Sequence, residues 1–233
     1  MLTRNKPELS IIIPFYNAEE FLSRSIDSVI EHSNFADVEL ILVNDGSTDE
    51  SPSIARKYSE EFEGITLVGQ ENCGIAAARN VGVETAQAQV LTFLDSDDDI
   101  LSARFTHGLA RTSRENPVVM GTMRIWARPG LDLPRHLKRS TEIPEAENFY
   151  IASAVIHRSV FDQGLMFNTL FDRAVDIEWW LRAQDAGVPM EQRVEAFTYR
   201  RIHGANVTFD AAVCSHWYRR AFLEHTQRLQ GKR

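Results

Sequence analysis

Apolar runs alternate with amphipathic stretches through the first 100 residues of the chain. Runs rich in Ile, Leu and Val predict strands at 9–15, 38–43, 65–68 and 90–94. Helices are predicted after the first three strands, over about 17–32, up to 58, and over 74–86. The first helix carries an apolar stripe, and Asn17 with Glu20 has the spacing of a capping box. Alternating strands and helices are typical of βαβ units, so we expect an α/β fold with a mostly parallel sheet.

The pattern is weaker in the second half of the chain. It predicts helices at 102–114, 176–186 and 210–229, and strands at 118–123, 149–156 and 195–199. Residues 127–147 are mixed in charge and contain three prolines, which predicts a loop. Long loops beside a rigid sheet often carry substrate contacts.

The charge balance limits the partners of the chain. With 25 basic and 33 acidic residues among 233, the formal net charge is −8. This argues against a nucleic-acid binder, because such proteins need a basic face. Cys73 and Cys214 lie far apart in the sequence and lack metal-site spacing, which fits a cytoplasmic protein. We find no apolar run of the ~18 residues that a membrane span needs.

The stretch VLTFLDSDDDI at 90–100 places four carboxylates at the end of a predicted buried strand. Asp45 follows the second strand, and Asp95, Asp97 and Asp98 follow the fourth. Because ligands bind at the carboxyl ends of parallel strands, we expect these side chains to line one crevice. Two unit charges ~4 Å apart repel by about 4 kcal/mol at an effective dielectric near ~20. A bound Mg²⁺ or Mn²⁺ would relieve that repulsion.

The acidic stretch has two other interpretations. An exposed acidic turn or helix start stays open on spacing alone. An EF-hand is excluded, because Ile100 occupies the position of the required glycine and Thr106 that of the required glutamate.

Four segments in this order and spacing resemble the nucleotide-sugar half of family 2 glycosyltransferases: SIIIPFYNAEEFL (10–22), LVNDGSTDES (42–51), NCGIAAARNVG (72–82) and FLDSDDD (93–99). More loosely, FNTLFDRAVDIEWWLRAQDAG (167–187) and YRRIHGANVT (199–208) resemble the acceptor side. The resemblance implies a GT-A fold, with a Rossmann-like central sheet, helices on both faces and a smaller acceptor-side portion. We interpret 1–233 as one domain, with a nucleotide-sugar-binding half at 1–100, an acceptor-binding half at 101–209 and a C-terminal helix at 210–233.

The resemblance also implies roles for residues that contact the nucleotide. The residues expected to flank the base are Pro14, Phe15 and Tyr16. Asp45 would accept a hydrogen bond from the imide N–H of uracil or thymine, and Arg79 would lie along the base and the nearby phosphate. From the residues alone, Asp45 is also a plausible turn residue in NDGS, and Arg79 a surface cation on an Ala-rich helix. Gly74 and Gly82 are expected to permit a turn and close helix packing.

Further roles concern the diphosphate and its metal. Asp95 is expected to take the ribose and the water shell of the metal, and Asp97 to bind the Mn²⁺ or Mg²⁺ that bridges the diphosphate. His203 would lie beside the metal, although a lone loop histidine is more often a surface residue or a satisfied partner. Arg201 would help to neutralise the leaving group.

Asp176 occupies the place of the family's general base. The family usually has Glu-Asp here, whereas this chain has Val175 before Asp176. Glu178 is held as a reserve base, although two positions along a helix is about 200° round its axis. The pair Trp179 and Trp180 is expected in the core, with stacking on a sugar as the alternative.

The implied reaction is an inverting transfer of one sugar from a nucleoside diphosphate sugar, expected to be a UDP-sugar, to a hydroxyl of a glycan or lipid-linked acceptor in cell-surface polysaccharide biosynthesis. The chain lacks a QxxRW-like motif, so we expect one sugar per encounter. One alternative is a catalytically impaired nucleotide-sugar-binding protein of the same fold. Another is a sugar-phosphate nucleotidyltransferase, which would need a Gly-rich loop where this chain reads PFYNAEE.

The C-terminal segment 217–233 has five basic residues and one acidic residue, a net of +4. Such a helix is suited to peripheral contact with an anionic membrane, where a lipid-linked acceptor would lie. A solvated helix packed through Trp217, Phe222 and Leu229 is the equally open alternative.

Overall fold

A computed structural model of the chain describes residues 6–33, 37–132, 150–204, 206 and 211–231. Its centre is an eight-stranded sheet with the order β3-β2-β1-β4-β7-β6-β8-β5. The strands are β1 (Leu9–Phe15), β2 (Val38–Asp45), β3 (Ile65–Gln70), β4 (Val90–Phe93), β5 (Asp99–Ile100), β6 (Val118–Ala127), β7 (Ala154–His157) and β8 (Glu191–Ile202). The α-helices are α1 (Leu22–His32), α2 (Ser51–Glu61), α3 (Ile75–Thr85), α5 (Ser159–Asp162), α6 (Val175–Asp185) and α7 (Ala211–Gln230).

The strands β1 to β4 form the parallel part of the sheet. β1 pairs in parallel with β2 and with β4, and β2 pairs in parallel with β3. Beyond β4 the sheet is mixed, because β7 is antiparallel to both β4 and β6 while β8 is parallel to β6. The carboxyl ends of β1, β2 and β4 therefore meet at one edge of the sheet.

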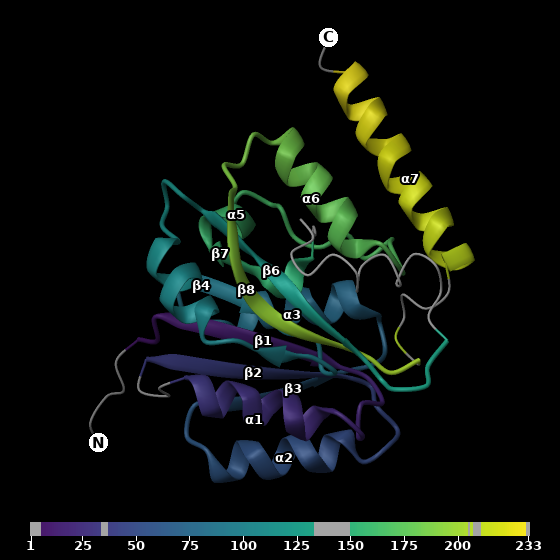
Figure 1. The fold of residues 1–233 in the computed structure, drawn as a ribbon. Coiled ribbons are helices and arrows are strands. Elements are labelled where there is room, and N and C mark those ends of the chain that lie inside the picture. Colours follow the sequence, from purple (N-terminus) through teal and green to yellow (C-terminus); the bar gives the residue numbers. More distant parts are fainter. Residues whose placement is uncertain (1–5, 34–36, 133–149, 205, 207–210, 232–233) are drawn as a thin grey trace.

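Helices cover both faces of the sheet (Figure 1). On β1, Ile11 and Ile13 are fully buried against the α1–α2 side, whereas Ile12 between them is buried on the α3–α6 side. This alternation follows from the two-residue period of a strand. At Gly82 on α3, a Cβ atom would lie 2.3 Å from Cγ2 of Ile12. The expected close packing of this helix on the sheet is confirmed.

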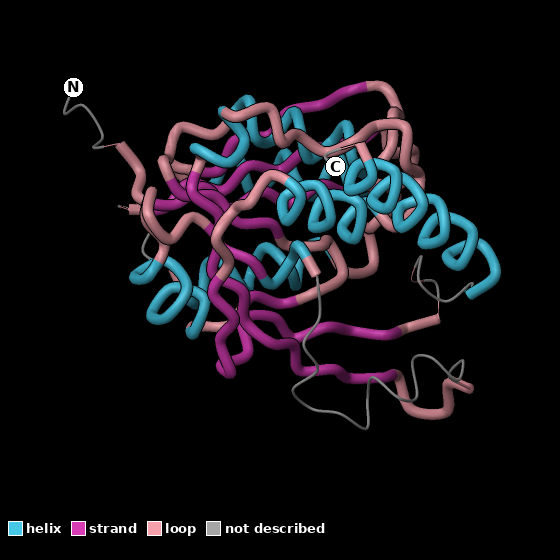
Figure 2. Tube along the Cα trace, turned by 90° about the horizontal axis from the view of Figure 1, so that it is seen from above, coloured by secondary structure: helices cyan, strands magenta, loops and turns pink. Residues whose placement is uncertain are grey.

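α6 and α7 form an outer pair of helices, which run side by side in Figures 1 and 2. Arg228 on α7 donates from Nε to Oδ2 of Asp185 on α6 at 2.6 Å. On the inner side of α6, Trp179 and Trp180 are 0% and 1% exposed. They belong to the core, as expected, and present no surface for stacking on a sugar.

Several predicted elements differ in the structure. α1 begins at Leu22 without a side-chain cap, and Asn17 has a φ of 47° while its Oδ1 accepts a hydrogen bond from the N–H of Thr48 at 2.8 Å. The capping box is therefore wrong, because Asn17 bonds the turn after β2 instead.

The predicted helix at 102–114 is present but shorter and irregular. It is a π-helix at Arg104–Gly108 and a 3₁₀ turn at Leu109–Arg111. The chain winds irregularly here because the buried Arg104 reaches inward to strand carbonyls.

The predicted strand at 149–156 begins only at Ala154, after a 3₁₀ turn at Ile151–Ser153. β6 and β8 are longer than predicted, and the predicted loop at 127–147 lies mostly outside the described residues.

Candidate active site

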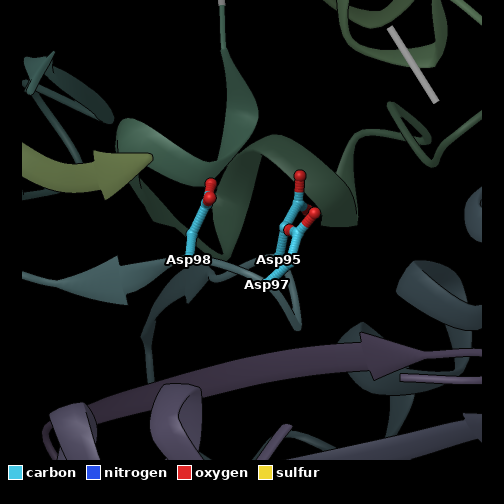
Figure 3. Close-up of side chains that lie close together, drawn as sticks. All are labelled: Asp95, Asp97 and Asp98. Carbon is cyan, nitrogen blue, oxygen red and sulfur yellow. The ribbon is translucent and has the colours of Figure 1, made fainter. Parts of the chain in front are cut away.

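Three aspartates of the loop after β4 gather at the strand end. Asp95, Asp97 and Asp98 each offer a carboxylate oxygen, and these oxygens lie within 4.8 Å of one another. Figure 3 shows the three side chains rising from one loop with their carboxylates on the same side. The loop is held by a backbone turn, in which the N–H of Asp98 donates to the carbonyl of Asp95 at 3.1 Å, and by the pairing of β5 with β8. The expected clustering of these carboxylates is thus present.

Arg79 connects this loop to α6. Its guanidinium is buried, with 3% exposure, and donates from Nη2 to Oδ1 of Asp95 at 3.1 Å and from Nη1 to Oδ1 of Asp176 at 2.5 Å. Only Nε lacks a partner among the described residues. Arg79 is therefore not a surface cation. Its contact with the nucleotide stays a prediction, because Nη1 and Nη2 each already donate to a carboxylate.

Asp176 lies in the first turn of α6, directly after Val175. Besides Arg79, it accepts a hydrogen bond on Oδ2 from the N–H of Ile151 at 3.0 Å. Its side chain keeps 17% exposure, so Asp176 is not sealed from solvent.

Glu178 does not provide a reserve base. It is 1% exposed, and both of its oxygens accept hydrogen bonds from Arg182, at 2.7 and 3.0 Å. The helix geometry turns Glu178 away from Asp176, into the core.

His203 lies beside Asp97, one of the three clustered aspartates. Nε2 of His203 lies 3.1 Å from Oδ2 of Asp97, and its ring packs on Phe21 with centroids 4.1 Å apart. Octahedral Mg²⁺ binds ligands at about 2.1 Å, which places neighbouring ligands about 3 Å apart. The 3.1 Å spacing is compatible with two such ligands and is equally that of a direct hydrogen bond between the two side chains, so a metal role for His203 stays a prediction. Asn206 Nδ2 donates to the same carboxylate oxygen at 2.8 Å.

Asp98 is enclosed and does not present itself to a ligand. It is 1% exposed, and its Oδ1 accepts the N–H of Arg201 at 3.0 Å. Burial, followed by the neighbouring carboxylates of Asp97 and Asp95, raises the pKa of Asp98 well above its ordinary value.

Arginines surround the acidic loop. Arg104 is fully buried beneath it and donates to the carbonyls of Phe93 and Phe197. Burial lowers the pKa of Arg104 to about 9, so it stays cationic at neutral pH. The guanidinium of Arg200 lies 4.9 Å from the ring centroid of Tyr150, whose hydroxyl donates to Asp95. These arginines therefore offset the repulsion among the carboxylates of the loop. A bound cation is not needed as the sole source of positive charge there.

Arg201 also contacts the acidic loop. Its Nε donates to the carbonyl of Asp97 at 2.9 Å, and its Nη2 pairs with Asp99 at 2.7 Å. Neutralisation of a leaving group by Arg201 stays a prediction.

Asp45, the residue expected to contact the base, lies at the end of β2. This residue is 4% exposed and accepts three hydrogen bonds, from Gln70 Nε2 at 2.6 Å and Cys73 N at 2.9 Å on Oδ1, and from Gly74 N at 2.9 Å on Oδ2. Each carboxylate oxygen has about two lone pairs, so Oδ2 keeps one that no hydrogen bond from the described residues uses, and contact with an imide N–H stays a prediction. Gly74 has a φ of 86°, which supports the turn that brings its N–H to Asp45.

The residues at the end of β1 differ in exposure. Tyr16 is 50% exposed, whereas Phe15 is 2% exposed and packs with α1 in the core. Pro14 is buried within β1. Only Tyr16 of the three offers a side chain to a base, and the other two are limited to backbone contact.

Sequence reasoning missed Tyr150, Arg200, Arg104 and Asn206. Tyr150 and Arg104 lie in segments without clear periodicity, and no local motif marks them. Arg200 and Asn206 lie within the segment at 199–208, where only Arg201 and His203 were singled out.

The comparisons place the chain among known proteins. The family model described as glycosyl transferase family 2 matches residues 10–225. The chain belongs to this family. It is 29% identical over 184 residues to the uncharacterized glycosyltransferase EpsJ of Bacillus subtilis, covering 72% of this chain and 52% of that protein. It is 46% identical over 97 residues to an uncharacterized glycosyltransferase of Haemophilus influenzae, covering 41% of this chain and 38% of that protein.

A third relative is the minor teichoic acid biosynthesis protein GgaB of Bacillus subtilis, 36% identical over 104 residues, with 44% of this chain and 12% of that protein covered. In these alignments the chain thus spans about half or less of each relative.

Among solved structures, S. aureus TarS 1-349 in complex with UDP-GlcNAc matches with a TM-score of 0.66 at 20% identity, covering 83% of this chain and 58% of that chain. This match confirms the expected GT-A fold. Within the described residues, no helix has both the length and the apolar character needed to cross a bilayer.

Proposed function

We propose that this glycosyltransferase family member moves one sugar from a UDP-sugar to a hydroxyl group of a glycan or lipid-linked acceptor, with inversion at the anomeric carbon. One observation carries this proposal: Arg79 joins Asp176 of α6 to Asp95 of the loop after β4, and this supports a base at Asp176 near the proposed donor site. The lone pair left on Asp45 Oδ2 supports a uracil base, because its imide N–H is a matching donor.

In the proposed reaction, the carboxylate of Asp176 accepts the proton of the acceptor hydroxyl. The hydroxyl oxygen then forms a bond to the anomeric carbon, while the bond from that carbon to the diphosphate oxygen breaks with its electron pair on the leaving group. Asp176 must come within hydrogen-bond reach of the hydroxyl for this step. Alignment of the donor with the acceptor hydroxyl contributes much of the rate enhancement in such a reaction. We expect the segment 167–173 before α6 to help position the acceptor.

Asp97 and His203 would hold the Mn²⁺ or Mg²⁺ that the family resemblance implies. When bound, such an ion supplies positive charge against the diphosphate. The spacing of 3.1 Å between the two ligand atoms supports this assignment.

The biological setting is inferred from relatives and from α7. The name of GgaB refers to teichoic acid biosynthesis, and TarS has been solved with UDP-GlcNAc. These names support a role in cell-surface polysaccharide biosynthesis. The exposed Phe222 and Leu223 lie beside Arg219 on α7, a combination that supports peripheral contact with an anionic membrane at its inner face.

A catalytically impaired nucleotide-sugar-binding protein is the second candidate. Val175 in place of a glutamate favours it, and so does the ion pair that already occupies one oxygen of Asp176. Family membership argues against a nucleotidyltransferase.

The deciding experiment combines binding with turnover. Thermal unfolding is followed with UDP, dTDP and GDP, each with and without Mn²⁺, because a ligand that binds only the folded state raises the melting temperature. We expect the largest rise with UDP and Mn²⁺, and slow release of UDP from UDP-sugars. Stabilisation without any release of UDP from a panel of UDP-sugars would favour the impaired binding protein. No stabilisation by any of the three nucleotides would overturn both candidates.

A further inference from the structure

Both oxygens of Asp95 are held by donors from distant parts of the chain. Arg79 on α3 donates to Oδ1 at 3.1 Å, and the hydroxyl of Tyr150 donates to Oδ2. Hydrogen bonds to an ionised carboxylate are strong, and one on each oxygen fixes the rotation of the group. The orientation of Asp95 is thus set by two residues that are not its sequence neighbours.

Tyr150 is itself firmly placed. Its carbonyl accepts hydrogen bonds from the N–H and the hydroxyl of Ser153, at 3.0 and 2.9 Å, and Arg200 covers its ring. Burial, followed by the charges of Asp95 and Asp98, raises the pKa of Tyr150 well above its ordinary value. The phenol therefore keeps its proton and acts as a donor at every physiological pH.

We propose that Tyr150 is a positioning residue for donor binding, which holds Asp95 so that its free lone pairs point at the ribose and at the cation-binding side of the diphosphate. After Arg79 and Tyr150 have each used one lone pair, about one remains on each oxygen. This inference rests on the proposed function, in which Asp95 contacts the donor. Partners that orient such a contact residue commonly change ligand affinity by about 10- to 100-fold.

The variant Tyr150→Phe tests the role, since it removes the hydroxyl and leaves the ring beneath Arg200. Tyr58→Phe is the matched control, because Tyr58 also donates its hydroxyl to an aspartate, Asp27, at 2.7 Å, but between α1 and α2. UDP binding is measured by calorimetry in the presence of Mn²⁺. We expect Tyr150→Phe to bind UDP about tenfold more weakly, and Tyr58→Phe to bind as the wild type does.

A double-mutant cycle with Asp95→Asn separates positioning from a general structural effect. If the hydroxyl acts through the Asp95 carboxylate, Tyr150→Phe should cost little further affinity once Asp95→Asn is present. A merely structural role would add the same loss in both backgrounds.

The outcomes separate this inference from the function on which it rests. If the wild type binds UDP but Tyr150→Phe binds it with unchanged affinity, or if the losses in the cycle are additive, the positioning role of Tyr150 is wrong. The proposed function is unaffected by either outcome. A wild type that fails to bind UDP with Mn²⁺ would overturn the proposed function, and the role of Tyr150 with it.

Discussion

The two halves of the chain supply the candidate site in different ways. In the first half, the loop with Asp95 and Asp97 follows directly on the regular strand β4, and Asp45 ends the regular strand β2. In the second half, Asp176 lies in the first turn of α6 and Tyr150 lies before β7, and both reach the site through contacts with Arg79 and Asp95. The part of the site that follows strand ends can be recognised as a local sequence pattern. The part that depends on contacts between residues far apart in the sequence cannot. The predictions below probe each half in turn.

The largest effect is expected at Asp176, the second half's reactive residue. Asp176→Asn removes the proposed base and should lower transfer by about 10²- to 10⁴-fold. UDP affinity should change little, because the contacts proposed for UDP involve Asp45, Asp95 and the cation site rather than Asp176. Transfer is measured as sugar incorporation and UDP binding by calorimetry. Transfer by Asp176→Asn at close to the wild-type rate would show that Asp176 is not the general base.

Asp97 tests the donor half. Asp97→Asn removes the charged partner of His203 and should lower transfer by about 100-fold, together with the stimulation by Mn²⁺. Activity is measured across a Mn²⁺ titration in both proteins. Equal stimulation of the variant and the wild type would place the cation elsewhere.

Arg79 tests whether the two halves depend on one another for stability. Arg79→Met leaves Asp95 and Asp176 without their shared cation, and removal of one partner of a buried pair costs about 3 kcal/mol or more in free energy of unfolding. Lys57→Met is the control, because Lys57 pairs with Glu61 at the surface with a side-chain exposure of 72%. That pair should contribute less than about 1 kcal/mol. Equal losses in urea unfolding of the two variants would contradict a coupling role for Arg79.

The smallest effect concerns Tyr58, far from the acidic loop. Burial, followed by its hydrogen bond to Asp27, raises the pKa of Tyr58 above the ordinary value for a tyrosine, to about 12. Because the folded state binds this proton more tightly, the contribution to stability is complete below pH 10 and is lost as the pH rises through 12.

The wild type should therefore lose about 1 kcal/mol relative to Tyr58→Phe over that range, after discounting for solvent screening. Chemical unfolding of both proteins at several alkaline pH values provides the measurement. Parallel stability curves would show that the hydroxyl of Tyr58 is not held by Asp27.

Predictions from the sequence were most accurate where burial and chain direction act locally. The alternation of Ile11, Ile12 and Ile13 reflects the period of a strand, and β1 occupies the predicted residues. Predictions failed where the position of a side chain depends on a partner that the local sequence pattern does not reveal. Arg104 turns inward to strand carbonyls and replaces the expected helix with π and 3₁₀ turns, and Glu178 pairs with Arg182 and leaves the site.

The sequence by itself determined the α/β class, the family and the position of the acidic strand end, because these depend on hydrophobic period and on contiguous motifs. The tertiary structure alone decided that Arg79 joins Asp95 to Asp176, that Tyr150 holds Asp95, and that arginines surround the acidic loop. The physical reason is that hydrogen bonds and ion pairs of buried groups depend on distances in space, which the spacing of residues along a chain does not encode.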